Sequence, residues 1–130
     1  MAHHFEFDSQ HRILRLVMKG DVQGEEIAAL NPEIRAHVHR LQPAAGISDF
    51  SAVENFNVSA QAMRTAAVQP SPYPTGTPRY IVAPTDFLFG MARMYEQVAD
   101  RPDSKLQVVR RIEDALTGLG AADARFETLT

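Results

Sequence analysis

The sequence predicts an α/β fold with the element order β-β-α-β-α-β-α-β-α, built on a mixed, mostly parallel sheet with an antiparallel hairpin at one edge. Its 130 residues fit a single domain, because one domain typically has about 100 to 200 residues. The spacing of apolar residues switches repeatedly between the period of two that strands have and the period of about 3.6 that helices have. Parallel strands need crossover connections, and helices between successive strands supply them.

The hairpin is predicted from the first two apolar segments. Residues 4–8 (HFEFD) alternate apolar and polar side chains, which is typical of a short strand. Residues 12–19 (RILRLVMK) form a second apolar run, which we expect to end at Gly20. Only the polar residues 9–11 separate the two segments, and a short polar turn between strands indicates an antiparallel pair.

A helix is expected after Gly20, because apolar residues recur there at intervals of three and four and so share one face. These residues are Ile27, Leu30, Ile34, Val38 and Leu41. Pro32 interrupts the pattern, but a proline is tolerated at the first helical position, and Asn31 before it is a good N-cap. We therefore expect a kink or a restart of the helix at Asn31, and an end at Pro43 and Gly46.

The middle of the chain contains a strand, a short helix and a loop. Residues 46–53 are a strand candidate, and Ser59 is placed to act as the N-cap of a helix over residues 60–69. Residues 69–78 (QPSPYPTGTP) include four prolines and one glycine. Prolines cannot donate to a strand ladder, so this segment is predicted to be an irregular surface loop.

The next strand and helix are separated by a proline. Residues 79–83 form an apolar strand that Pro84 ends, and Thr85 or Asp86 is placed to cap the helix that follows. Apolar side chains recur at helical spacing in that helix, at Phe87, Met91, Met94, Tyr95 and Val98. A turn is expected at residues 101–103.

The last two predicted elements are a strand over residues 106–109 and a helix over residues 112–119 that Gly120 can end. We expect one domain over residues 1–120. Residues 121–130 show no strong period, so we expect this tail to be frayed.

Composition excludes several classes of protein. The chain is 45% hydrophobic and 22% charged, which is ordinary for a globular protein and too apolar for disorder. The lack of cysteine rules out disulfides, thiolate metal sites and a cysteine nucleophile. A formal charge of −3 does not favour nucleic-acid binding. No apolar run reaches about 18 residues, so we expect no membrane insertion and a cytoplasmic protein.

Catalytic, metal and cofactor motifs are not recognisable in the sequence. His37 and His39 are two residues apart on a helix, so they point to different faces and cannot share a metal ion. Asp49 and Ser51 share one face of a strand, but no histidine is placed to complete a triad. There is also no nucleophile elbow and no glycine-rich phosphate loop. We therefore predict no catalytic residue, metal or cofactor, and no enzymatic activity.

Partner binding is predicted mainly from the helix that begins at Asp86. Its apolar residues lie on more than one face, and neighbours such as Leu88 and Phe89 cannot point the same way. They either belong to a core covered on most sides or form a dimer contact or the wall of an apolar pocket. The candidates for an interface or pocket are Phe87, Leu88, Phe89, Met91 and Tyr95, together with Tyr73 of the proline-rich loop.

Three segments, in this order and spacing, resemble the STAS domain, the SpoIIAA-like family of anti-sigma-factor antagonists. Residues 16–22 (LVMKGDV) resemble its strand, glycine turn and first helix, and residues 48–53 (SDFSAV) resemble its D-L-S-G-V strand. Residues 112–116 (IEDAL) resemble the E-E-A-L start of its last helix. The resemblance covers about residues 5–120. It implies a regulatory, non-enzymatic domain that acts by contact with another protein.

The phosphorylation motif of that family is altered in this chain. The family has D-S-S-G or D-S-T-G at the start of its second helix, and a partner kinase phosphorylates the first serine. The corresponding residues 57–60 read NVSA, so Val58 occupies the acceptor position and only Ser59 keeps a hydroxyl group. Ser59 is thus the candidate phosphoacceptor, with a helix cap as the structural alternative. The candidate contacts of the motif loop are Asp49, Ser51 and Asn57.

A second function is suggested by another group that is similar in fold. The chain looks closer to bacterial proteins that share the STAS fold without the switch motif, and the CRAL-TRIO-like lipid-binding group is related to that fold. That resemblance implies an apolar ligand between the sheet and a mobile helix. The alternative is therefore a small-molecule or lipid-binding domain with the helix over residues 86–100 as one wall of the pocket.

Overall fold

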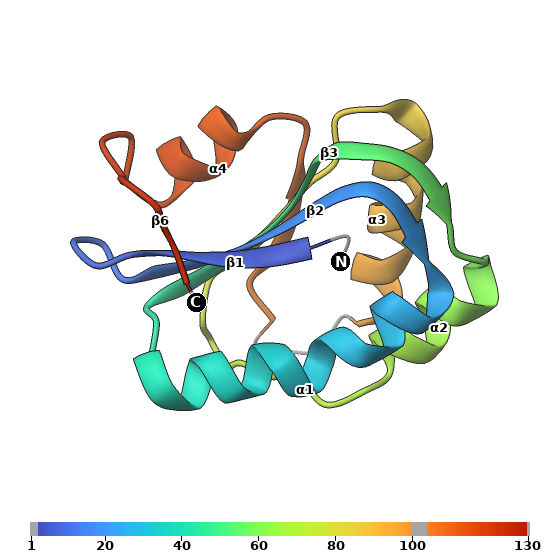
Figure 1. Cartoon of the computed structure of the whole chain (residues 1–130), viewed down its shortest axis with the longest axis horizontal. Coiled ribbons are helices and arrows are strands. Elements are labelled where there is room, and N and C mark those ends of the chain that lie inside the picture. Colours follow the sequence, from blue (N-terminus) through green and yellow to red (C-terminus); the bar gives the residue numbers. More distant parts are fainter. Residues whose placement is uncertain (1–2, 100–103, 130) are drawn as a thin grey trace.

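A computed structural model describes residues 3–99 and 104–129, which form one six-stranded sheet and four helices (Figure 1). The predicted α/β class, with a mostly parallel mixed sheet and an antiparallel hairpin, is confirmed. The strands are β1 (His3–Asp8), β2 (Ile13–Gln23), β3 (Ala45–Asn57), β4 (Arg79–Val82), β5 (Leu106–Val109) and β6 (Glu127–Thr128). The helices are α1 (Gly24–Leu41), α2 (Ala60–Ala67), α3 (Asp86–Val98) and α4 (Ile112–Gly118).

The strand order across the sheet is β5-β4-β3-β2-β1-β6. Strands β2, β3, β4 and β5 are parallel to one another, and β1 runs antiparallel to both β2 and β6. The hairpin of β1 and β2 is therefore not the edge of the sheet, because β6 covers β1. The turn expected at residues 101–103 lies outside the described residues.

The C-terminal segment differs from the frayed tail that we expected for residues 121–130. Glu127 and Thr128 pair with β1, and the amide of Leu129 donates to the carbonyl oxygen of Phe5 at 2.9 Å. Ala121 is fully buried. A two-residue strand is too short to show a hydrophobic period, so only its pairing with β1 reveals it.

Strands β2 and β3 run further than predicted and form a long curved ribbon (Figure 1). Gly20 does not end β2: it has a φ of +66° and continues the strand to Gln23. The register with β3 shifts between Val17 and Lys19 and again between Gly20 and Asp21. Irregularities of this kind bend a strand without ending it, and glycine adopts the positive φ at little cost.

Helix α1 continues through Pro32, so the restart expected at Asn31 does not occur. Asn31 is not an N-cap: its Nδ2 donates to the carbonyl oxygen of Pro70 at 3.0 Å, and its Oδ1 accepts from Arg35 at 3.1 Å. Pro32 removes one backbone hydrogen bond from the helix interior. The buried face of Ile27, Leu30 and Val38 offsets that loss, because packing supplies most of the stability of a protein helix.

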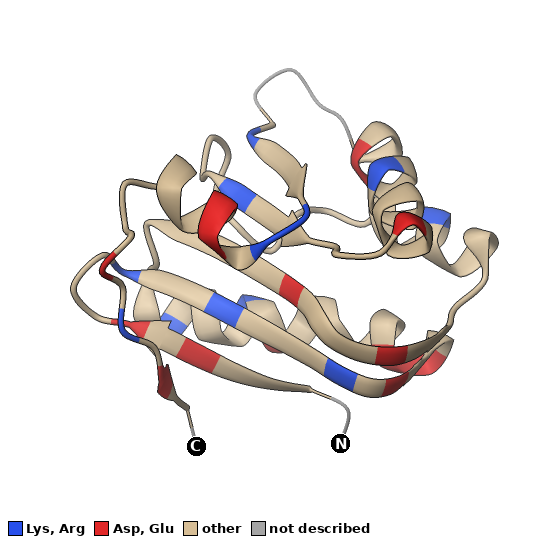
Figure 2. Ribbon diagram, turned by 90° about the horizontal axis from the view of Figure 1, so that it is seen from above, with Lys and Arg blue, Asp and Glu red and all other residues tan. Residues whose placement is uncertain are grey.

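The helices cover the two faces of the sheet unequally. Helices α1, α2 and α3 pack on one face, and α4 with the C-terminal segment packs on the other (Figures 1 and 2). On the first face, Leu16 and Met18 of β2 pack against α1. On the second face, Ile47 and Val82 pack near Ala115 of α4. None of the helices in the described part of the chain combines the length and the apolar character that crossing a bilayer requires.

Candidate ligand-binding pocket

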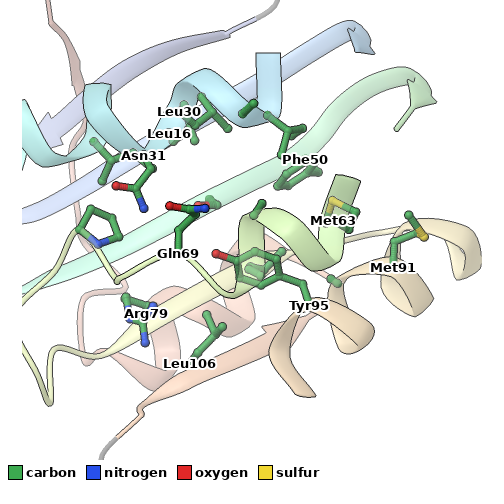
Figure 3. A pocket seen from close by; sticks show the side chains of 18 of the residues that line it. Leu16, Leu30, Asn31, Phe50, Met63, Gln69, Arg79, Met91, Tyr95 and Leu106 are labelled. Carbon is green, nitrogen blue, oxygen red and sulfur yellow. The ribbon is translucent and has the colours of Figure 1, made fainter. Parts of the chain in front are cut away.

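An apolar cavity of about 460 Å³ lies between the sheet and helices α1, α2 and α3 (Figure 3). Protein interiors contain few voids larger than a water molecule, and a water occupies about 30 Å³ in the liquid. The cavity has room for about fifteen waters on that scale, so it is not a packing defect. Its volume falls in the range of small-molecule pockets, roughly 300 to 1,000 Å³.

Small residues that face one another leave this space open. Gly46 and Ser48 of β3 line the cavity from the sheet, and Ala62 and Ala66 of α2 and Ala92 of α3 line it from the helices. Helix α2 is only eight residues long, and two of the four residues that it contributes to the wall are alanines. Larger apolar residues complete the wall, among them Leu16, Ile27, Leu30, Phe50, Met63, Leu88 and Met91.

Tyr73 closes part of the cavity from the proline-rich loop. Its ring lies against the backbone of Gly46, where an added Cβ would overlap the Oη and Cζ atoms of Tyr73 and lie 2.9 Å from Cε1. Burial raises the pKa of the Tyr73 phenol well above its ordinary value, although the positive charge of Arg79 opposes the shift. Tyr73 is therefore a neutral wall of the pocket.

The polar groups of the cavity gather toward one end. Figure 3 shows the side chains of Asn31, Gln69 and Arg79 in one half of the cavity, and those of Met63 and Met91 in the other. The Nη2 atom of Arg79 donates to the Ser104 hydroxyl at 3.3 Å. Apolar walls with a few polar groups at one end are typical of pockets that bind and orient an organic ligand.

The six residues predicted for an interface or pocket divide into two groups. Those that line the cavity are Tyr73, Leu88, Met91 and Tyr95. Phe87 does not line it: its side chain is 59% exposed and packs edge-on against Phe56, with ring centroids 6.3 Å apart. Phe89 is also outside the cavity, under the guanidinium of Arg110, which lies 4.2 Å from the ring centroid.

The residues predicted from the STAS motif do not join the cavity. Asp49 points to the opposite face of the sheet, where it is 2% exposed and forms an ion pair of 2.6 Å with Arg15. Its other oxygen accepts from the backbone amide of Ser51 at 2.9 Å. Ser51 and Asn57 are exposed. Ser59 caps α2, because its hydroxyl accepts from the amide of Ala62 at 3.0 Å.

Several lining residues were not predicted as site residues from the sequence. Ile27 and Leu30 of α1 fit an ordinary amphipathic helix, and Arg79 fits the polar start of a strand. Their place around a cavity depends on which elements face one another, and hydrophobic periodicity carries no information on that. The small residues Gly46, Ala62 and Ala66 are the one feature of the sequence that could have indicated an open space here.

His3, outside the cavity, joins β1 to α1. It is 7% exposed, and its ring nitrogens lie 2.7 Å from a Glu26 carboxylate oxygen and 2.8 Å from one of Glu33. Burial alone would lower the pKa of His3, but the hydrogen bonds to Glu33 and Glu26 outweigh burial and raise it above 6.5. For nearby His37 the pKa is lowered, by burial and then by Arg40.

His3 is therefore expected to make the protein less stable as the pH rises. Because its pKa is raised by folding, His3 contributes to the free energy of unfolding. That contribution is complete below about pH 6.5 and is lost as the pH rises through the pKa of His3 in the folded protein. The lowered pKa of His37 changes the free energy of unfolding only below about pH 6.5. Urea unfolding from pH 6.5 upward should show a falling free energy of unfolding in the wild type and a flatter profile in His3→Gln. The exposed His39→Gln is the control, and equal slopes for His3→Gln and wild type would contradict the assignment.

Comparison with known proteins gives no relative from which a function could be transferred. No family model, curated protein or solved structure matches this chain. The resemblance to the STAS domain stays a prediction made from the residues.

Proposed function

We propose that this protein binds a small apolar or amphipathic molecule in the cavity between the sheet and helices α1, α2 and α3. The observation that supports the proposal is the cavity of about 460 Å³ with its largely apolar lining. This is the small-molecule or lipid-binding alternative predicted from the sequence, with α3 as one wall. Four candidates from the sequence contribute to it, namely Tyr73, Leu88, Met91 and Tyr95.

An apolar wall that faces empty space lacks dispersion contacts, and an apolar ligand supplies them. Burying apolar surface contributes about 25 cal/mol of favourable free energy for each Å² removed from water. A ligand that binds only the folded state also stabilises the fold by mass action, so binding and thermal stability should rise together.

Filling the cavity with protein atoms tests the proposal. Ala66 lines the cavity from α2, whereas Gln61 of the same helix is exposed and does not line it. Ala66→Phe should weaken binding of the neutral fluorescent probe N-phenylnaphthylamine by about tenfold or more, and Gln61→Phe should leave it unchanged. Ala66→Phe should not lower the melting temperature, because the added ring occupies existing space.

Two outcomes of this comparison would contradict ligand binding in the cavity. One is a wild-type protein that produces no increase in probe fluorescence. The other is equal probe affinity in Ala66→Phe and Gln61→Phe, which would place the probe elsewhere on the surface.

A second proposal is the non-enzymatic regulatory contact with another protein, in the cytoplasm, that the STAS resemblance implies. It is supported by the exposure of Ser51, Asn57 and Ser59, because a partner protein or kinase can reach exposed side chains. A phosphate on Ser59 would lie at the N-terminus of α2, where a negative charge is favourable.

A further inference from the structure

Arg79 brings a positively charged group to the cavity wall. Among the described residues that line the cavity, Arg79 is the only one whose side chain carries a full charge at neutral pH. Tyr73, which also lines the cavity, stays neutral because its pKa is raised. A positive charge beside apolar walls acts more strongly than in water, because the surroundings screen it poorly.

Arg79 lies where a ligand's polar head would be placed. It is partly buried at the start of β4, in the same half of the cavity as the amides of Asn31 and Gln69 (Figure 3). Its guanidinium has five N–H donors in a planar fork, so it can keep contacts such as that to Ser104 and also bind a carboxylate. Arg35, 3.1 Å from Asn31, adds a second positive charge beside this end.

The opposite half of the cavity suits a flexible hydrocarbon chain. Met63, Met91 and Phe50 line it, and methionine side chains adapt readily to different shapes. If each heavy atom of a chain takes about the volume of a water molecule, roughly 30 Å³, the cavity holds about fifteen of them.

We infer that the ligand is a single-chain amphiphile with an anionic head: an acyl carboxylate whose head contacts Arg79 and whose tail extends toward Met63 and Met91. This inference rests on the proposed function, because it assumes that the cavity is the binding site. It adds the charge of the ligand and its direction in the pocket.

Three probes with the same tail and different heads test the inference. Dodecanoate, dodecanol and dodecyltrimethylammonium, each below its micellar concentration, are titrated against the complex of the chain with N-phenylnaphthylamine. From its displacement of the probe, dodecanoate should show an affinity about tenfold higher than that of dodecanol, because a charge-assisted hydrogen bond favours the anion. Dodecyltrimethylammonium should bind most weakly.

Arg79→Met should lower the affinity for dodecanoate to that for dodecanol and leave dodecanol unchanged. Arg79→Lys keeps the charge without the planar fork and should retain part of the preference. Arg64→Met is the matched control, because Arg64 is exposed on α2 and does not line the cavity. Circular dichroism checks that each variant is folded. If Arg79→Met does not fold, the test rests on the order of the wild-type affinities for the three compounds and on the affinities of Arg79→Lys.

The outcomes separate the two levels of the proposal. Equal affinities for dodecanoate and dodecanol in the wild type, or a preference that Arg79→Met leaves intact, would overturn the anionic head while the cavity remains a binding site. Failure of all three compounds and of N-phenylnaphthylamine itself to bind would overturn the proposed function.

Discussion

Arg15→Met is expected to lower the free energy of unfolding by about 3 kcal/mol, because it leaves the Asp49 carboxylate buried without its cation. Asp49 is 2% exposed, and one of its oxygens accepts from Arg15 Nη2 at 2.6 Å and from Nε at 3.2 Å. Arg15 also donates to Glu6 at 2.9 Å. Figure 2 shows basic and acidic residues side by side on neighbouring strands of the sheet. The Arg15 side chain is 23% exposed, which places the cost at the lower end for buried ion pairs.

A double-mutant cycle measures this effect by urea unfolding. Replacing both partners, in Arg15→Met with Asp49→Leu, should recover most of the loss, because an apolar pair leaves no buried charge. Arg111→Met is the control: Arg111 contacts Asp114 at 3.4 Å on the surface, and its loss should cost less than about 1 kcal/mol. An effect of Arg15→Met no larger than that of Arg111→Met would contradict the role of the buried pair.

The ion pair of Asp49 could not be predicted from the sequence. A polar residue in an apolar strand has no local explanation, so we interpreted Asp49 as a contact of a functional loop. Its partner Arg15 is 34 positions away, and only the parallel pairing of β2 and β3 brings them together. The ion pair across the sheet gives Asp49 a structural role that its own segment does not reveal.

The elements that were predicted correctly are those with local signals. The caps Ser59 and Thr85 each accept a hydrogen bond from an amide three residues later, as their sequence context indicated. The errors have non-local causes. Gly20 stays within β2 because β3 pairs with it, and Asn31 does not cap a new helix because its amide bonds to Pro70 instead.

The pocket was predicted only as an alternative with one helix as its wall, and the rest of its lining could not be predicted for a related reason. The cavity exists because Gly46, Ala62 and Ala66 lack side-chain atoms at places where the sheet and α2 face each other. Each of these residues is unremarkable in its own segment. Their combination defines a site only after the crossover connections have set the distance between the sheet and the helices.

Gly46→Ala is expected to push Tyr73 out of the cavity wall at a cost of about 1 to 3 kcal/mol in the free energy of unfolding, the usual range for overpacking. The added methyl group would overlap both Oη and Cζ of Tyr73, so removing the hydroxyl in Tyr73→Phe cannot relieve the clash. Tyr73→Ala should cost less free energy of unfolding in the Gly46→Ala background than in the wild type, because the ring no longer packs on residue 46. Gly90→Ala is the matched control, because nothing lies within 4 Å of its added Cβ.

Titration of the phenols by ultraviolet absorbance reports where Tyr73 lies. In the wild type, burial keeps its pKa well above the ordinary value, so Tyr73 should stay protonated when the pH passes about 10. In Gly46→Ala the displaced ring reaches water, and one more tyrosine should ionise near that pH. An unchanged titration curve together with unchanged stability would mean that the ring does not rest on Gly46. A changed curve accompanied by weaker binding of N-phenylnaphthylamine would identify this contact as the one that holds the loop over the cavity.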